Sequence, residues 1–509
     1  MKSIIKFGSF MNIRSWLNFR KTENILLGIL LYGIVLSYTY QYVKIANKNG
    51  IFGEDQRFYY MEAKAISAYN IYQAPLSLDG NTSAIGNFGT HGGSYAIIDG
   101  WLSKLFCHTQ DPPLVFINFL ICMAMLLLII LFKPFSLNTR LKIALLVATH
   151  HVLLSFTLTY FQETIHFLWA VLAARTLYLL YLQPKNFYNI NLFYYLLLIM
   201  IAITFRYSWF VWGLGLLPLA TGFNNFIKYL LIAAGLFFFG IFVAKYIYAP
   251  YPYYDNNALI KTSSLLNYLF NLWNNVIHNL KTFLILDERP AIICTRYLFI
   301  SLLVVNSWYA IVKRNKFTIA SSLIAWGYFF ALLTFYYVGS LLSTDARILA
   351  VLNPLLAFSL IGNYNSFIFY PIIALQLWFL PSVIKESNPY SDTTLSNNVY
   401  TDERISRDAG YSKIKDLITD DEDVTVEISY QFVFYVPNYF QDFPLATSKG
   451  HAIHYRMYMN GNDLRKVHHT RYLCAVEKVE NGAYEYMFPI AKCQLLYSDQ
   501  WIHFYKILD

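Results

Sequence analysis

The sequence has little charge for its length. Asp, Glu, Lys and Arg make up 14% of its 509 residues, whereas hydrophobic residues make up 57%. Soluble domains carry roughly 25% charged residues, so this chain has too little polar surface to cover its apolar side chains in water. The composition excludes an ordinary soluble protein and predicts that lipid covers part of the chain.

The sequence also lacks the cysteine patterns of a zinc site. Its five cysteines form neither a Cys-x-x-Cys pair nor a Cys/His zinc spacing. Two of them, Cys474 and Cys493, lie in the C-terminal tail. They could form a disulfide if the tail is outside the cytosol, and two unpaired buried thiols are the equal alternative.

Positive charge is unevenly distributed along the chain. Residues 384–509 contain 13 Lys and Arg against 18 Asp and Glu, whereas residues 1–383 contain 26 against 12. In the first part the basic residues lie in short segments between apolar runs. This pattern is typical of the cytoplasmic loops of a membrane protein, and it does not indicate a nucleic-acid partner.

Eleven apolar runs approach the roughly 20 residues that a helix needs to cross a bilayer. Residues 190–223 can be divided into two short helices, as done here, or taken as one long kinked helix. The runs lie at residues 24–43, 114–132, 142–160, 164–182, 190–208, 209–223, 229–248, 292–312, 317–339, 348–363 and 367–383.

The N-terminal segment, residues 1–23, is basic and is predicted to stay in the cytoplasm. The first run is too long for the core of a cleaved signal peptide, so we expect it to remain as a helix. Alternating the runs across the cytoplasmic membrane puts loop 44–113 outside. The same alternation puts three basic connections in the cytoplasm, those that contain Lys133, Lys185 and Arg314.

The tail changes in character at residue 384. Linker-like residues precede a segment with helical spacing at 405–417 and strand-like segments at 424–428, 471–479 and 501–507. We predict a mainly α-helical, polytopic membrane protein with a small α/β soluble domain. Its parts are a cytoplasmic N-terminus at 1–23, a transmembrane domain at 24–383 with outer loop 44–113, and an extracytoplasmic domain at 384–509.

Charged residues at the mouths of membrane helices are costly and point to function. Glu54 and Asp55 follow the first helix on the outer side, where a carboxylate could act as a general base or cap a helix. Glu163 lies in a short turn and has the same helix-cap alternative. His91, among glycines, could bind a phosphate or hold an ordinary turn.

Two arginines also lie at predicted outer helix ends. Arg206 is near the end of the run at 190–208, and Arg347 precedes the next-to-last run. A guanidinium group matches phosphate oxygens well. The alternatives are that Arg206 extends its charged end into water and that Arg347 forms an ion pair with Asp345.

The order of these elements resembles the GT-C superfamily of membrane glycosyltransferases. The resemblance is to the bacterial branch that is similar to protein O-mannosyltransferases and to the lipid A aminoarabinose transferase, and it spans about residues 20–360. The matching elements are Glu54-Asp55 (an early acid), residues 90–95 (His-Gly-Pro-x-Tyr), 160–163 (Tyr-x-Glu), 204–208 (Thr-Arg-x-Thr-Gly) and 345–354 (Glu-Arg-Tyr-x-x-Pro). Gly93, Ser208 and Ile348 replace the Pro, Gly and Tyr of those elements.

The resemblance implies transfer of a sugar from a polyprenyl-phosphate-linked donor, on the outer face of the cytoplasmic membrane, with inversion at the anomeric carbon. Asp55 would be the catalytic base, with Glu54 as the alternative. A lipid, a glycan or a protein remains open as the acceptor. The candidate substrate-binding residues are His91, Glu163, Arg206, Arg347, Tyr59 and Tyr95.

A divalent metal cation would suit Glu54, Asp55 and Glu163, although no ligand spacing requires one. The alternative functions are a transporter or flippase of lipid-linked sugars, a polysaccharide polymerase and a catalytically silent assembly protein. Transporters often contain internal repeats and midplane charges. This sequence shows no repeat, and its candidate residues lie at outer helix ends, which favours an enzyme.

Overall fold

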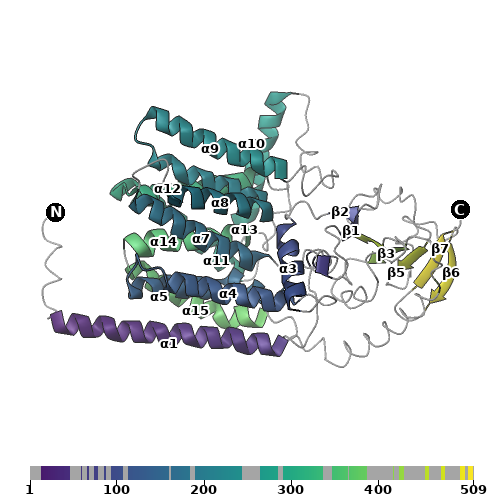
Figure 1. Ribbon diagram of the computed structural model, residues 1–509, viewed down its shortest axis with the longest axis horizontal. Helices are drawn as coiled ribbons and strands as arrows, with labels where there is room; N and C mark the ends of the chain where they lie inside the picture. The colour runs from purple at the N-terminus through teal and green to yellow at the C-terminus, as the bar shows by residue number, and fades with distance from the viewer. Residues whose placement is uncertain are drawn as a thin grey trace.

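The computed structural model is a bundle of helices joined to a mixed β-sheet (Figure 1). It describes most of the chain between residues 13 and 386 and the strands of the tail. The described residues are 13–45, 59, 63, 66–67, 74–77, 85–86, 93–106, 113–159, 162–183, 190–243, 264–284, 290–335, 347–364, 366–386, 417, 424–428, 453–457, 472–475, 493–498 and 503–507.

The helices of the bundle follow the predicted apolar runs, which confirms a mainly α-helical fold. They are α1 (Ile13–Ile45), α4 (Leu114–Ile130), α5 (Leu137–Ala148), α6 (His151–Phe156), α7 (Glu163–Leu182), α8 (Ile190–Phe205), the 3-10 helix η2 (Tyr207–Leu219), α9 (Phe223–Phe242), α11 (Pro290–Lys313), α12 (Lys316–Phe335), α13 (Arg347–Ala350), α14 (Asn353–Asn363), η5 (Ser366–Ile368) and α15 (Phe369–Glu386). Among the helices whose bounds the structure describes, α3 (Ser94–Leu105) and α10 (Leu265–Leu284) lie outside the runs.

The described helices suit a lipid environment. Five spans, within α1, α7, α9, α11 and α12, are long and apolar enough to cross a membrane, and five shorter apolar helical segments accompany them. Outward-facing side chains are apolar too, and Ile29, Leu231 and Trp308 are each more than half exposed. Apolar surface of this extent requires lipid, so the chain is a multi-pass membrane protein.

The predicted run at 142–160 is not one continuous helix. α5 and α6 are separated by a break at His150, whose side chain accepts a hydrogen bond from the Val152 amide at 3.3 Å. His150 Nε2 also lies 2.6 Å from the side-chain nitrogen of Asn353. The prediction was wrong here because hydropathy does not reveal a histidine that caps a helix inside the bundle.

The two short helices predicted within residues 190–223 are confirmed, and they divide at Arg206. The backbone of Arg206 is extended, with φ −158° and ψ 119°. The 13 residues of η2 far exceed the three or four of a usual 3-10 helix. Gly215 allows η2 to approach α12, since an added Cβ would lie 2.7 Å from the Ile324 side chain.

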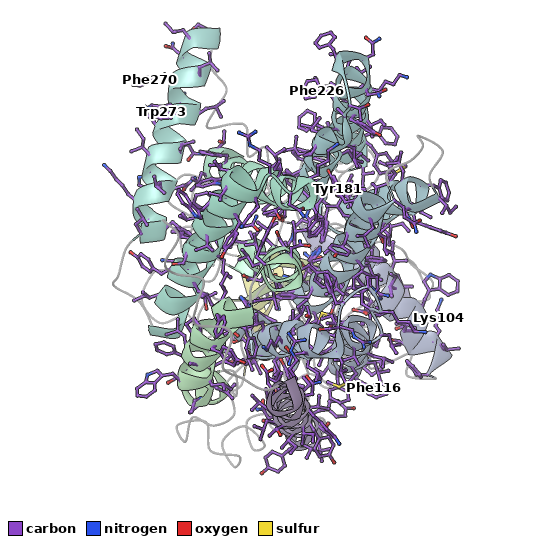
Figure 2. The ribbon with its side chains drawn as sticks, turned by 90° about the vertical axis from the view of Figure 1, so that its left-hand side faces the viewer. Lys104, Phe116, Tyr181, Phe226, Phe270 and Trp273 are labelled. Atoms are coloured by element: carbon purple, nitrogen blue, oxygen red, sulfur yellow. The ribbon has the colours of Figure 1, made fainter. Side chains whose placement is uncertain are left out.

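α10 has a polar face toward the bundle and an apolar face away from it. Asn275 and Asn279 are buried and donate hydrogen bonds to carbonyls in the last turn of α12, at 2.7 and 2.9 Å. On the other face Phe270 and Trp273 are each 62% exposed (Figure 2). The asparagines satisfy carbonyls that a helix end leaves without partners, and the apolar face suits lipid.

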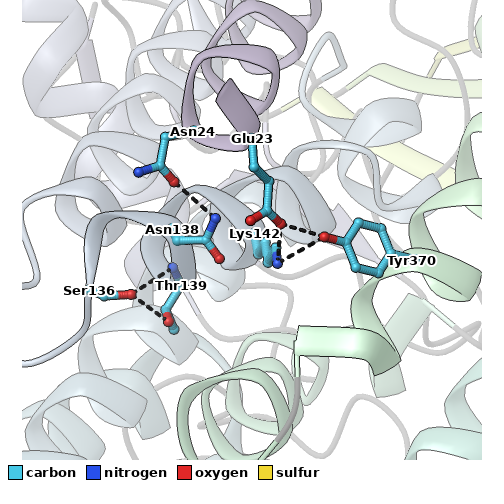
Figure 3. A network of polar contacts seen from close by, with 7 residues as sticks. All are labelled: Glu23, Asn24, Ser136, Asn138, Thr139, Lys142 and Tyr370. Atoms are coloured by element: carbon cyan, nitrogen blue, oxygen red, sulfur yellow. Dashed lines mark hydrogen bonds and ion pairs between the residues drawn. The ribbon is translucent and has the colours of Figure 1, made fainter. Parts of the chain in front are cut away.

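An ion pair between a buried lysine and a partly exposed glutamate connects α1 to the bundle (Figure 3). Lys142 of α5 is 1% exposed and lies 2.6 Å from the carboxylate of Glu23 on α1. That carboxylate also accepts a hydrogen bond from the hydroxyl of Tyr370 on α15. Nearby, the Asn138 amide donates to Asn24 at 2.9 Å. Charge-assisted hydrogen bonds thus join three helices that are distant in the sequence.

Lys142→Met should destabilise the protein by about 3 kcal/mol, because it leaves a poorly solvated carboxylate without its cation. This value is at the lower end for a buried pair, since Glu23 keeps 14% exposure. Thermal unfolding in detergent measures the change. Adding Glu23→Gln should recover part of the loss, and a single variant as stable as the parent would contradict this account.

The described strands form one seven-stranded sheet with the order β2-β1-β4-β3-β5-β7-β6. Two strands, β1 (Ala74–Ser77) and β2 (Ile85–Gly86), come from loop 44–113, and β1 runs parallel to β4 with Leu76 opposite Tyr455. The tail contributes β3 (Val424–Ile428), β4 (Ile453–Met457), β5 (Tyr472–Ala475), β6 (Cys493–Ser498) and β7 (His503–Ile507).

The sheet joins loop 44–113 to the C-terminal tail, and the predicted domain boundaries stay predictions. The strands predicted in the tail are confirmed, and the helix predicted at 405–417 lies almost wholly outside the described residues. The loop and the tail do not form separate units, because strands of both pair in one sheet. An open sheet cannot cross the hydrocarbon core, because its edge strands would leave backbone groups without hydrogen bonds. The strands from the loop and from the tail therefore lie on the same side of the membrane.

The strand order also bears on the predicted alternatives for the two tail cysteines. Cys474 lies in β5 and Cys493 in β6, and these strands flank β7 on opposite sides. Strands two positions apart in a sheet are separated by about 10 Å. A disulfide requires Cα atoms within about 7 Å, so this strand arrangement excludes the pairing.

Candidate functional site

A buried ion pair lies at the ends of three helices. Glu163 is the first residue of α7, and Arg206 lies at the break between α8 and η2. Arg206 Nη2 donates to Glu163 Oε1 at 3.3 Å, and the two side chains are 7% and 1% exposed. Buried charges are rare unless they are paired, so the fold keeps two costly groups together where the sequence predicted a site.

The local backbone explains both positions. An acid in the first turn of a helix interacts favourably with the helix dipole, which suits Glu163. The amide of Arg206 still donates to the Ala202 carbonyl at 3.1 Å, so the hydrogen-bond ladder of α8 ends there. The guanidinium then turns inward to Glu163 instead of extending to water, which excludes the snorkelling alternative.

Polar and aromatic groups of η2 and α12 surround Arg206. The Tyr328 hydroxyl is 2.7 Å from Ser208 Oγ, and Arg206 acts electrostatically on that hydroxyl. One helical turn after the start of α7, His166 Nδ1 accepts a hydrogen bond from the Trp209 indole at 3.0 Å. These hydrogen bonds fix the positions of the side chains of η2, α7 and α12 that surround the ion pair.

α3 brings loop 44–113 to the ion pair. Ser94 Oγ donates to Thr204 Oγ1 at 2.8 Å, two residues before Arg206. α3 lies between the bundle and the sheet (Figure 1) and packs against α4 and α8. The loop that carries the predicted acids is therefore anchored at the end of the bundle where the ion pair lies.

Two predicted substrate-binding tyrosines meet beside this anchor. Tyr95 of α3 is fully buried, and its ring meets that of Tyr59 edge-on with centroids 5.1 Å apart. The Tyr95 hydroxyl lies within electrostatic reach of Glu163. The structure therefore brings Tyr59, Tyr95, Glu163 and Arg206 into one region.

The other four predicted site residues are only partly described. Glu54, Asp55 and His91 lie outside the described residues, so their roles stay predictions. Arg347 is the first residue of α13, which packs against α7, and its side chain is likewise outside the described part.

α3 also carries a carboxyl group that the sequence did not single out. Asp99, one turn after Tyr95, is completely buried, and neither carboxyl oxygen has a hydrogen-bond partner in the described part of the chain. Burial raises the pKa of Asp99 well above its usual range, although the nearby Tyr95 hydroxyl opposes this. Burial and the Asp99 carboxyl raise the pKa of Tyr95. Both shifts favour the neutral groups.

The predicted divalent cation is not tested by the described residues. Among them, no three His, Cys, Asp or Glu side chains lie close enough to hold a metal ion. Of the three acids that would suit a cation, the structure describes Glu163, which is paired with Arg206. The other two, Glu54 and Asp55, lie outside the described residues.

Fold and site together define a polytopic helical membrane protein with a buried charge pair where its first loop meets the helix ends. No family model and no curated protein matches the sequence. Among solved structures, an oligosaccharyltransferase from Archaeoglobus fulgidus, in complex with Zn and sulfate, is similar to 87% of this chain over 67% of its own length. The TM-score is 0.49 and the sequence identity 11%, a likeness too distant to assign an activity.

Proposed function

We propose that this protein is a membrane glycosyltransferase of the GT-C type. It transfers a sugar from a polyprenyl-phosphate-linked donor to an acceptor on the outer face of the cytoplasmic membrane. The observation that carries the proposal is the buried Glu163–Arg206 pair beside α3. This pair joins two of the sequence elements that resemble the family, and it lies beside α3 of the loop that holds two more.

The position suits a lipid-linked donor. The polyprenyl chain of such a donor lies in the bilayer and its phosphate at the interface. A cationic group at a helix end is therefore within reach of the phosphate, and a guanidinium can bind two of its oxygens at once. Arg206 is held at such an end by Glu163.

In the proposed reaction the acceptor oxygen attacks the anomeric carbon of the donor sugar. The bond from that carbon to the phosphate oxygen breaks, and the phosphate leaves with the electron pair. The proton of the acceptor hydroxyl passes to the Asp55 carboxylate, with Glu54 as the alternative base. Attack from the face opposite the leaving phosphate inverts the anomeric configuration.

The remaining residues stabilise charge or position substrates. The leaving phosphate gains negative charge, which Arg206 and Arg347 would stabilise. Glu163 holds Arg206 in place through its carboxylate. Tyr59 and Tyr95 supply aromatic and hydroxyl surface on the loop side, and His91 would contact the phosphate.

A transporter or flippase is the alternative function, and the position of the ion pair favours the enzyme over it. The bundle contains a cavity of about 20 Å³ beside His150, Asn353 and Gln376. This volume is close to the minimum for one water molecule. The ion pair, moreover, lies at helix ends and not at the membrane midplane, where transport sites are typical.

Mass spectrometry of envelope glycolipids tests the proposal. Cells that contain the protein should hold at least one sugar-modified product that is missing when the gene is deleted. Glu163→Gln should reduce that product at equal protein level. Identical glycan spectra with and without the protein would contradict the proposal. If the deletion changes only the membrane face on which a lipid-linked sugar is found, and not its structure, the result would favour the flippase.

A further inference from the structure

The Asp99–Tyr95 pair on α3 stands out among the buried polar groups of the described residues. Both side chains are completely buried. Their polar atoms make no hydrogen bond of ordinary geometry there, although the Tyr95 hydroxyl lies close to the Asp99 carboxyl and to the Asn118 side chain. The next polar residue on the same face, Ser103, is satisfied by donating to the Asp99 carbonyl at 2.6 Å. Leaving a buried polar group unmatched costs the protein stability, so its retention requires a reason.

No described cation balances the Asp99 carboxyl. Between described residues, ion pairs join Lys142 to Glu23 and Arg206 to Glu163, and neither pair includes Asp99. Without a cation in a buried position, a carboxyl group keeps its proton. A protonated carboxyl offers one donor and one or more acceptors, and the Tyr95 hydroxyl offers the same combination.

This combination selects a particular ligand chemistry. A hydroxyl group both donates and accepts, so it can satisfy a neutral acid and a phenol together. A phosphate mainly accepts, and a metal cation would require the ionised carboxylate. Sugars present several hydroxyls, and the phosphate site proposed at Arg206 is near, because Glu163 acts electrostatically on the Tyr95 hydroxyl.

We propose that Asp99, as a neutral acid, and Tyr95 together bind a hydroxyl group of a sugar substrate and help to select it. The proposal rests on the proposed function, which supplies the sugar. The hydroxyl could come from the donor or from a sugar acceptor, and the experiment separates these two sources. A buried structural water is the competing occupant.

Stability gives the first readout. If only a bound ligand completes the hydrogen bonds of this pair, the ligand-free protein carries a destabilising buried polar group. Asp99→Leu replaces that group by an apolar one and should raise the unfolding temperature of the ligand-free protein in nanodiscs. Ser103→Ala on the same face should lower that temperature slightly, since it removes a made hydrogen bond. A lower unfolding temperature for Asp99→Leu would mean that Asp99 has a structural partner or water, and would overturn the proposal.

Binding gives the second readout, with the full chain in nanodiscs and no acceptor. The probes are neryl phosphate and neryl phosphate that carries mannose, glucose, galactose or xylose. The unmodified protein should bind at least one sugar-bearing probe about tenfold more tightly than neryl phosphate. Asp99→Leu should remove this preference, Asp99→Asn should retain most of it because an amide also donates and accepts, and Ser103→Ala should leave it unchanged.

The outcomes separate the two proposals and the two sources of the hydroxyl. A sugar preference that depends on Asp99 without any sugar transfer would contradict the proposed function and support this inference. A loss in Asp99→Leu confined to the KM of a sugar acceptor, with donor preference intact, would assign the hydroxyl to the acceptor. Full donor preference together with an unchanged acceptor KM in Asp99→Leu would overturn the inference, as would a protein that distinguishes no sugar.

Discussion

Asp55→Asn is expected to lower the rate of sugar transfer by about 10²–10⁴-fold, the usual contribution of a general base. The amide has nearly the shape of the carboxylate but cannot accept the proton of the acceptor hydroxyl. The measurement is the initial transfer rate from a polyprenyl-phosphate sugar in proteoliposomes, normalised to the amount of folded protein. Insertion and unfolding temperature should stay close to those of the parent.

Glu54→Gln is the matched control for this prediction. It removes the neighbouring carboxylate with the same change in chemistry and is expected to have the smaller effect on the rate. If Glu54→Gln causes the large loss and Asp55→Asn does not, the assignment of the base passes to Glu54. If neither variant loses activity, the proposed general-base mechanism is wrong.

Arg206→Gln is expected to cost about 10²–10³-fold in rate, because the developing charge on the departing phosphate loses a preorganised donor. This variant also leaves the Glu163 carboxylate buried without its cation, which should destabilise the protein by about 3–5 kcal/mol. The double variant Arg206→Gln with Glu163→Gln removes both charges and should recover most of the stability. Its transfer rate should remain low.

Arg175→Gln provides an arginine control on the same bundle. Arg175 is half-buried on α7, with its guanidinium 5.1 Å from the centre of the Phe132 ring. It lies 12 residues after Glu163, about 18 Å along the helix. Its replacement should leave the transfer rate within about twofold. An Arg206 double variant that is both stable and active would show that the phosphate is not bound at this pair.

The membrane helices could be predicted because lipid imposes one simple demand on them, a long apolar surface. Departures from the prediction arise where a polar side chain changes the backbone. His150 interrupts the run at 142–160 by capping α6 from inside the bundle. Nothing in the hydropathy of its neighbours distinguishes that position from the middle of a continuous helix.

Glu163 and Arg206 could be predicted as a site from their positions in the sequence, whereas Asp99 could not. Charges next to long apolar runs stand out in the sequence, and both lie at helix ends. Asp99 lies on α3, which buries polar side chains and exposes apolar ones, the reverse of an amphipathic helix in a soluble protein. Trp101 and Leu105 are 53% and 72% exposed, whereas Asp99 is buried. An amphipathic pattern gives the two faces but not which of them meets the protein.

The pairing of loop and tail strands in one sheet also could not be predicted from the sequence. β1 has four residues and β2 has two, too few for an alternating pattern to identify. Their pairing with the tail depends on contacts between positions such as Leu76 and Tyr455, which are distant in the chain. Only the topology, with loop and tail both outside, indicated that the two segments could meet.

The most direct test of the central claim is an electron cryomicroscopy structure of the full chain in a lipid nanodisc with bound polyprenyl phosphate. The account predicts the phosphate against the guanidinium groups of Arg206 and Arg347, at the membrane face where loop 44–113 and the tail sheet lie. It also predicts the Asp55 carboxylate across the position that a sugar would occupy. A phosphate bound elsewhere, or Asp55 on the opposite side of the membrane from Arg206, would contradict it.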